Sequence, residues 1–256
     1  MKIINFYSFK GGVGRSLALI NVAYHLERSG QRVGLVDLDI EACGLNHILL
    51  RPPIPEDRDF LSLINPRNRD LSNLEQYVDE ISFANEGKPG VFLIPTIADS
   101  ELLDQISWGL DTQHFLLYDL FPAFGRLYDL DFLLIDSRSG LSDFSTFALK
   151  IADAEVLVCR LDNQNRYGIS RMVKVCKLAG KIFRVVVSGC PEKGYELHLR
   201  NFEKAIDEKV NYLLPYEPRL YYEEFTISMR LPRHKLSRLY ASLALDLLKA
   251  VKSERT

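Results

Sequence analysis

The residues best suited to chemistry lie in one short segment near the N-terminus, SFKGGVGRS at positions 8–16. Its three glycines permit tight turns and allow the backbone to approach an anion closely. Successive backbone N–H groups can then cradle phosphate oxygens, helped by the start of the helix expected to follow. Lys10 and Arg15 supply positive charge, and the Ser16 hydroxyl is a suitable Mg²⁺ ligand. The segment therefore predicts a phosphate-binding loop.

Acidic residues end two of the apolar runs that are expected to form strands. Asp37 and Asp39 close RVGLVDLD, and Asp136 closes FLLID. Ligands of open α/β sheets bind beyond the carboxyl ends of the strands, so these carboxylates are expected near the phosphate loop. There they can hold Mg²⁺ and orient an attacking water. The sequence thus predicts a site for metal-assisted phosphoryl transfer.

The segment KGGVGRS resembles the deviant Walker A motif, KGG-x-x-K-[ST], of the ParA/MinD family of P-loop ATPases, which belong to the SIMIBI class. Lys10 matches the signature lysine of that family, which reaches across a face-to-face dimer to the partner's nucleotide. Arg15 stands where the family has its second lysine, so the chain departs from the motif there. Arginine keeps the charge and can fork onto phosphate oxygens.

The resemblance implies a set of site residues and cofactors. ATP or ADP with Mg²⁺ is expected, with Asp39 placing the hydrolytic water. The expected catalytic residues are Lys10, Arg15 and Asp39, and the expected metal ligands are Ser16, Asp37 and Asp136. The expected nucleotide contacts are Gly11, Gly12, Val13, Gly14, Arg15, Ser16, Leu17, Pro215 and Tyr216.

Two loops beside the acids differ from the usual family sequence. EACGL at 41–45 follows Asp39 and is expected to be switch-like, and SRSG at 137–140 replaces the family's D-x-P-P continuation. Arg138 can touch phosphate, meet a partner subunit or pair with a surface acid, and the sequence leaves all three open.

Short apolar runs alternate with longer helical patterns along the chain. This alternation favours an α/β fold with a doubly wound, mostly parallel sheet and helices on both faces. The expected strands cover 2–7, 32–37, 91–95, 132–136, 155–160 and 181–188. The expected helices cover 15–29, 100–107, 115–127, 142–151, 169–179, 197–209 and 235–252. The region 51–90 is expected to be irregular, with surface loops at RPPIPEDRD and SFANEGKPG. Residues 163–166 are expected to form a polar loop, with contact to a partner subunit as the alternative, and Trp108 is expected to be a buried anchor. No linker divides the chain, so one domain over 1–256 is expected.

Composition excludes several classes of protein. The 256 residues carry 32 Lys and Arg against 34 Asp and Glu, a formal charge of −2, which argues against a protein built mainly to coat nucleic acid. No secretory signal or run of roughly 18 apolar residues is present. Cys43, Cys159, Cys176 and Cys190 form no C-x-x-C. Free thiols in a reducing cytoplasm are therefore expected, and an iron–sulfur function is rejected.

Two weaker signals lie near the C-terminus. Arg230, Arg233, Lys235 and Arg238 form a basic cluster that can bind DNA phosphates non-specifically or simply face solvent. The amphipathic last helix is expected to pack on the sheet rather than act as a membrane anchor.

These features together predict a slow Mg²⁺-dependent ATPase that works as a dimerisation switch. ATP closes a homodimer that engages a partner protein or a surface, and hydrolysis releases it, as in partitioning of DNA or positioning of cargo. The alternative is an ATP-gated regulatory or signalling module whose turnover is incidental. A phosphotransferase is less well supported, because the C-terminus has no Tyr-rich tail.

Overall fold

The computed structural model describes residues 1–49, 55, 58–64, 71–83, 90–97, 110–222 and 226–253, the side chains of 110–116 and 221 excepted. The helix predicted at 100–107 and the predicted anchor Trp108 lie outside these residues.

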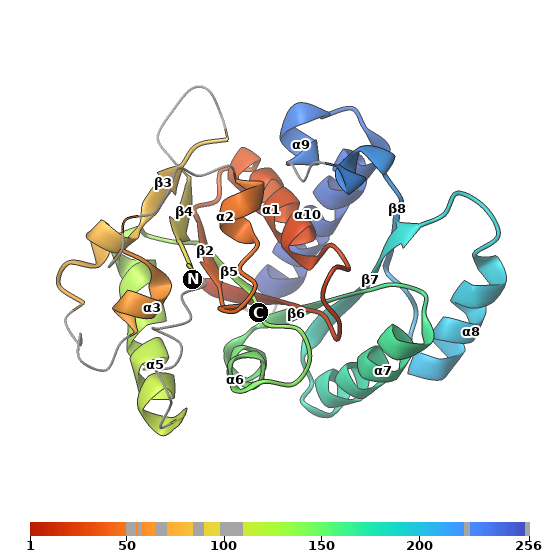
Figure 1. The fold of residues 1–256 in the computed structure, drawn as a ribbon, viewed down its shortest axis with the longest axis horizontal. Coiled ribbons are helices and arrows are strands. Elements are labelled where there is room, and N and C mark those ends of the chain that lie inside the picture. The colour runs from red at the N-terminus through yellow and green to blue at the C-terminus, as the bar shows by residue number, and fades with distance from the viewer. Residues whose placement is uncertain are drawn as a thin grey trace.

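An eight-stranded sheet forms the centre of the described structure, in the order β3-β4-β2-β5-β1-β6-β7-β8 (Figure 1). Its strands are β1 (Lys2–Tyr7), β2 (Val33–Asp37), β3 (Asp79–Ile81), β4 (Val91–Ile94), β5 (Phe132–Asp136), β6 (Ala154–Cys159), β7 (Ile182–Cys190) and β8 (Tyr212–Pro215). Neighbouring strands run parallel except β3 and β4. The predicted doubly wound, mostly parallel sheet is confirmed.

The helices connect and cover these strands. They are α1 (Arg15–Arg28), α2 (Leu45–Ile48), α3 (Phe60–Leu63), α5 (Leu110–Leu127), α6 (Asp143–Ile151), α7 (Asn163–Leu178), α8 (Glu196–Ile206), α9 (Ile227–Arg230) and α10 (Lys235–Ser253), with short 3₁₀ turns η1 (Leu74–Tyr77) and η2 (Pro218–Tyr221).

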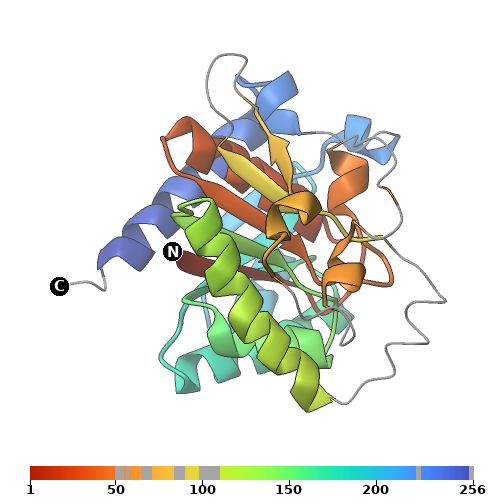
Figure 2. The ribbon, with the colours of Figure 1, turned by 90° about the vertical axis from the view of Figure 1, so that its left-hand side faces the viewer.

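Helices pack on both faces of the sheet because the central strands bury side chains on both sides. Ile4 and Phe6 of β1 belong to the core beneath α1 and α10, whereas Tyr7 joins the core beneath α7 and α8. A third apolar cluster contains side chains of α5 and α6. Figure 2 shows α5 lying across the front of the sheet. β1 is therefore a central strand, between β5 and β6, with helices on both sides of the sheet. The segment that follows β1 starts at the carboxyl ends of these central strands.

The structure corrects the sequence analysis in three places. β3 and β8 lie in regions where no strand was predicted. The polar loop predicted at 163–166 is wrong, because α7 begins at Asn163. Asp162 caps this helix: its carboxylate accepts hydrogen bonds from the backbone N–H of Asn165 at 2.8 Å and from the Asn165 side chain at 2.6 Å.

The last helix packs on the body of the protein as predicted. Leu243, Leu247 and Val251 of α10 are buried in the cluster that they share with α1. Within the described residues, every helix is too short or too polar to cross a bilayer.

Candidate functional site

The glycine-rich loop joins β1 to α1 through backbone conformations that favour glycine. Gly12 and Gly14 have φ angles of 70° and 81°, in the left-handed region, and Gly14 is the N-cap of α1. A Cβ added at Gly12 would meet nothing within 4 Å, so the apex of the loop faces open space. The loop therefore brings backbone N–H groups and the start of a 14-residue helix to one place, which suits an anion.

Neighbouring strands and α7 hold this loop from the side. Arg160, which follows β6, donates a hydrogen bond through Nη2 to the carbonyl oxygen of Gly12 at 2.8 Å. The Ser188 hydroxyl of β7 donates to the carbonyl oxygen of Val13. Phe9 packs so closely on Gly168 of α7 that a Cβ there would lie 1.9 Å from a ring atom. The loop is thus braced before any ligand binds.

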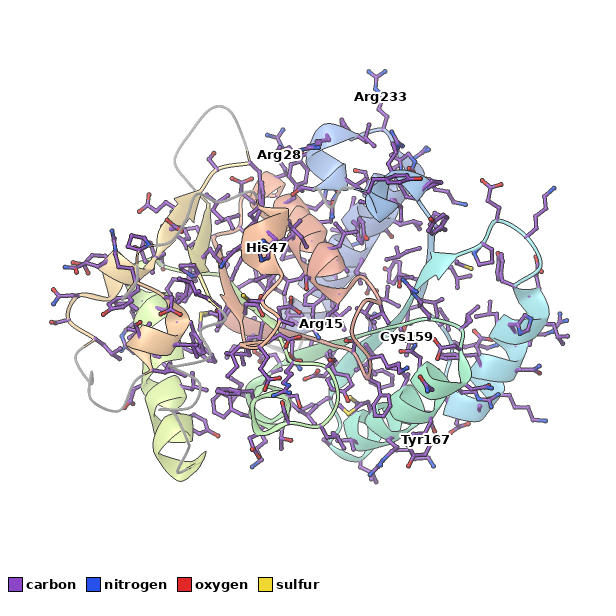
Figure 3. All side chains as sticks on the ribbon, viewed as in Figure 1. Arg15, Arg28, His47, Cys159, Tyr167 and Arg233 are labelled. Carbon is purple, nitrogen blue, oxygen red and sulfur yellow. The ribbon has the colours of Figure 1, made fainter. Side chains whose placement is uncertain are left out.

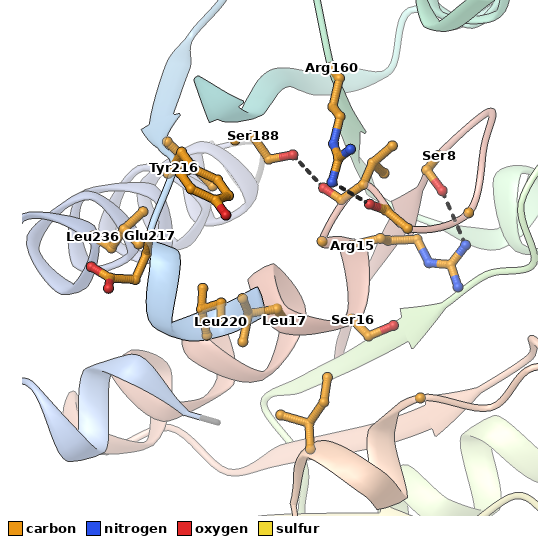
Figure 4. A pocket seen from close by; sticks show the side chains of 18 of the residues that line it. Ser8, Arg15, Ser16, Leu17, Arg160, Ser188, Tyr216, Glu217, Leu220 and Leu236 are labelled. Atoms are coloured by element: carbon orange, nitrogen blue, oxygen red, sulfur yellow. Dashed lines mark hydrogen bonds between the residues drawn. The ribbon is translucent and has the colours of Figure 1, made fainter. Parts of the chain in front are cut away.

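A cavity of about 510 Å³ opens beside the loop, at the carboxyl edge of the sheet. The loop forms one end, and Tyr216, Glu217, Leu220 and Leu236 line the other (Figure 4). All the predicted nucleotide contacts, from Gly11 to Leu17 together with Pro215 and Tyr216, line this cavity. Its size is in the range of small-molecule and cofactor sites. Residues and cavity therefore fit a nucleotide.

Arg15 is the first residue of α1, and Figure 3 shows it near the centre of the molecule. Its guanidinium donates hydrogen bonds to two carboxylates. Nε donates to Asp136 Oδ1, Nη2 donates to Asp39 Oδ2 at 2.9 Å, and Nη1 donates to Ser8 Oγ at 3.2 Å. Burial by itself lowers the pKa of Arg15, but Asp136 and Asp39 outweigh it and raise that pKa. Arg15 is therefore a buried, permanently charged partner of two predicted site carboxylates.

Asp37 organises the loop that follows β2. Its Oδ1 accepts the backbone N–H of Asp39 at 2.9 Å, and its Oδ2 accepts those of Gly44 and Leu45 at 2.9 and 3.2 Å. Burial, and next the charge of Asp136, raise the pKa of Asp37 well above its usual value. These bonds fix the predicted switch-like segment 41–45, and a direct metal contact of Asp37 stays a prediction.

Asp136 and Ser16 meet the requirements of a Mg²⁺ site. Asp136 Oδ2 is buried and has no hydrogen-bond partner among the described residues. Burial raises the pKa of Asp136, while the neighbouring Arg15 and Ser16 oppose that rise. The described residues contain no group of three or more His, Cys, Asp or Glu able to hold a metal. Mg²⁺ in phosphate sites keeps several waters and takes one or two carboxylates, so Asp136 and Ser16 fit it.

Four of the residues singled out from the sequence do not line the cavity: Asp37 and Asp136 are buried behind its wall, and Lys10 and Arg138 lie outside it. Lys10 is exposed at the start of the loop and does not line the cavity of its own chain. Arg138 forks onto Glu41, with nitrogen–oxygen distances of 2.7 and 2.6 Å. Of the three partners considered for Arg138, the structure shows the surface acid, which is Glu41.

The sequence analysis did not name Arg160 as a site residue, and it placed Ser8 in the predicted phosphate loop without giving that side chain a role. Both line the cavity, and both follow or end a strand at the carboxyl edge of the sheet. Strand ends were the available signal, because ligands bind there in open α/β sheets. Arg160 was overlooked because no motif contains it.

The comparisons with known proteins agree with this geometry. The family model AAA_31, described as an AAA domain, matches residues 1–185. The flagellum site-determining protein YlxH of Helicobacter pylori is 29% identical over 161 residues, which are 63% of this chain and 49% of that protein. Other curated relatives are named iron–sulfur cluster carrier proteins or assembly factors. The chain thus spans about half or less of the length of each of these curated relatives.

Two solved structures share the fold along nearly the whole chain. A ParA family ATPase from Chlorobium tepidum has a TM-score of 0.75 at 20% identity, with 95% of this chain and 97% of that chain covered. The septum site-determining protein MinD from Pyrococcus horikoshii, solved with Mg-ADP, has a TM-score of 0.76 at 18% identity, with 96% and 95% covered. The predicted resemblance is confirmed: the chain belongs to the AAA domain family AAA_31 and has the fold of the ParA and MinD P-loop ATPases.

Proposed function

We propose that the chain binds ATP with Mg²⁺, hydrolyses it slowly, and pairs with a second copy of itself while ATP is bound. In this proposal residues 1–256 form a single domain that works in the cytoplasm. The closed dimer engages DNA, a cargo or a partner protein. The observation that carries the proposal is the glycine loop, which opens at the start of α1 into a cavity lined by all the expected nucleotide contacts.

The roles of the residues follow from their positions. Backbone N–H groups of 11–16 hold phosphate oxygens, and Ser16 and Asp136 hold Mg²⁺. When bound, Mg²⁺ neutralises charge on the phosphates and fixes their orientation. Asp39 lines the cavity and places the attacking water. Catalysis then consists of positioning and charge stabilisation, since phosphoryl transfer needs little covalent help from the protein.

Exposed Lys10 supports a role between subunits. It starts the loop yet does not line the cavity of its own chain, so its ammonium group is available to the nucleotide of a facing copy. Two ATP molecules brought face to face repel each other, and cations supplied by the opposite subunit offset that repulsion.

A second candidate is an ATP-gated regulatory module with incidental turnover. It is favoured by Arg15, which engages both Asp39 and Asp136 and so competes with their use in hydrolysis. The exposed residues Arg230, Arg233, Lys235 and Arg238 are compatible with DNA binding in either case. An iron–sulfur cargo has less support, because Cys159, Cys176 and Cys190 are buried and the sequence has no C-x-x-C.

Equilibrium titration with fluorescent ATP tests the proposal. We expect saturable binding that unlabelled ATP competes for better than GTP does, because no N-K-x-D guanine motif follows the later strands. Chelation of Mg²⁺ should weaken binding. Absence of saturable binding, or equal displacement by ATP and GTP, would contradict the assignment. A phosphate-release assay with and without DNA then separates a DNA-stimulated switch from a module with incidental turnover.

A further inference from the structure

We propose that Arg160, rather than Arg15, is the cation that this chain itself presents to the phosphates of its bound nucleotide. The inference rests on the proposed ATP binding and assigns a phosphate-contacting residue that the loop motif does not contain.

Three of the five N–H donors of the Arg15 guanidinium, one on each nitrogen, already bond to protein groups. Nε and the two Nη atoms donate to Asp136, Asp39 and Ser8. The residue is only 7% exposed, and Figure 4 shows its side chain extending away from the Tyr216 end of the cavity. Turning it toward phosphate would leave two largely buried carboxylates without their cation, which is costly.

Arg160 has the opposite character. It is exposed and lines the cavity, and within the described structure its Nη2 donates a hydrogen bond to the Gly12 carbonyl. Guanidinium carries five N–H donors in a fixed plane, so one bond to the loop leaves several directed elsewhere. Figure 4 shows the side chain reaching down onto the loop from the sheet edge. The loop bond thus holds a cation beside the place where phosphates bind.

The charges of the cavity lining point the same way. Its described cationic residues are Arg15 and Arg160, while Asp39 and Glu217 are acidic. With Arg15 neutralised by carboxylates and Lys10 outside the cavity, Arg160 remains to offset phosphate charge within one chain. Guanidinium matches the geometry of phosphate oxygens and can take two of them at once.

A purely structural role for Arg160 has a different signature. If Arg160 only braced the loop through the Gly12 carbonyl, any side chain able to donate one hydrogen bond would replace it. Gln keeps an N–H donor and loses the charge, whereas Lys keeps the charge and loses the fork. The pair Arg160→Gln and Arg160→Lys therefore separates bracing from phosphate contact.

The test is equilibrium binding of ATP, ADP and adenosine to the full chain with Mg²⁺, in wild type and in Arg160→Ala, Arg160→Gln and Arg160→Lys. A hydrogen bond to a charged partner predicts that Ala and Gln weaken ATP binding by about tenfold or more, leave adenosine binding within about twofold, and that Lys recovers part of the loss. Added salt should reduce the difference between wild type and Arg160→Gln, because exposed charges are screened.

Arg200→Ala on α8 is the matched control, since it removes an exposed arginine that does not line the cavity and should bind ATP as wild type does. ATP affinity of Arg160→Gln within threefold of wild type would overturn the inference in favour of bracing, as would unchanged affinity in Arg160→Ala. If wild type itself does not bind ATP, the proposed function fails instead. Thermal unfolding without nucleotide confirms that the variants fold.

Discussion

Two groups of buried polar residues lie in or beside the sheet, and they differ in how their charges are compensated. At the carboxyl edge, Arg15 donates to Asp39 and Asp136. Farther inside, Glu155 of β6 pairs across the ladder with Asn5 of β1, whose side-chain nitrogen donates to it at 2.8 Å. There Glu155 Oε1, Asn5 Oδ1 and the Tyr7 hydroxyl have no hydrogen-bond partner among the described residues.

This difference indicates which of the two groups can hold charged side chains. The edge group contains a guanidinium and opens on a cavity. The inner group has no ion pair in the described structure, and burial raises the pKa of Glu155 to about 8, with Asn5 and Lys181 opposing the rise. We infer that Glu155 is held mostly as the neutral acid at pH 7 and that the edge group is the one suited to phosphate chemistry.

Arg15→Met should produce the largest effect on stability. It leaves the Asp39 and Asp136 carboxylates without their buried cation, which typically destabilises a protein by about 3–5 kcal/mol. Urea unfolding in the presence of EDTA measures it, and Arg15→Lys, which keeps the charge, should lose clearly less. A loss below about 1 kcal/mol in Arg15→Met would show that the pairing is not important for folding.

Glu155→Gln should make stability less sensitive to pH. The folded pKa of about 8 lies above the unfolded value of 4.5, so the folded state holds a proton that the unfolded state releases. Wild-type stability therefore falls as pH rises from 4.5 to 8, by on the order of a few kcal/mol, whereas the variant lacks this loss. Unfolding at pH 5 and pH 8 should show near-equal stability at the lower pH and a more stable variant at the higher one. Parallel pH profiles would refute the raised pKa.

Asp136→Asn should remove the response to metal that Glu155→Gln keeps. Asp136 Oδ2 is the unpartnered buried oxygen beside the loop, and Asn offers a weaker, uncharged ligand. Thermal unfolding with ATP, with and without Mg²⁺, should show a Mg²⁺-dependent rise in Tm in wild type and Glu155→Gln only. Since ligand stabilisation follows RT ln(1 + [L]/Kd), a tenfold loss of affinity lowers it by about 1.4 kcal/mol. An undiminished shift in Asp136→Asn would remove this residue from the metal site.

The smallest effect on stability is expected from the exposed ion pair between Arg138 and Glu41. Arg138 and Glu41 are both substantially exposed, so Arg138→Ala should cost about 1 kcal/mol or less in unfolding experiments. ATP affinity should stay within about threefold of wild type, since Arg138 does not line the cavity. A larger loss of affinity would mean that this ion pair holds the nucleotide site closed.

Much of the fold was predictable because its signals are local. Runs such as FLLID contain only apolar residues before a terminal acid, so β5 was bounded correctly at both ends. β3 has three residues, DEI, of which two are acidic, and β8 has four, YLLP, a short apolar run that ends in a proline. Both are edge strands, for which the sequence signal is weaker. The predicted start of α7, residue 169, is too late. The first turn of the helix, NQNR, is polar, and its start depends on the cap provided by Asp162.

The residues of the site were easier to predict than the hydrogen bonds between their side chains. The glycines, Ser16 and the strand-end acids follow from spacing, and of these the glycines, Ser16 and Asp39 line the cavity. The direction of the Arg15 side chain was not predictable, because it depends on three partners that are 7, 24 and 121 residues away in sequence. Arg160 was missed for the same reason: it meets the loop across 148 residues.

Sedimentation velocity with ADP, ATP and a slowly hydrolysed ATP analogue, each with Mg²⁺, tests the proposed switch most directly. Wild type should be monomeric with ADP and dimeric with ATP or the analogue. Lys10→Ala should bind ATP but remain a monomer, because it removes the cation offered to the facing subunit. Asp39→Ala should accumulate as the ATP dimer with reduced phosphate release. A dimer of Lys10→Ala as stable as that of wild type, or wild-type turnover by Asp39→Ala, would contradict the face-to-face ATP dimer.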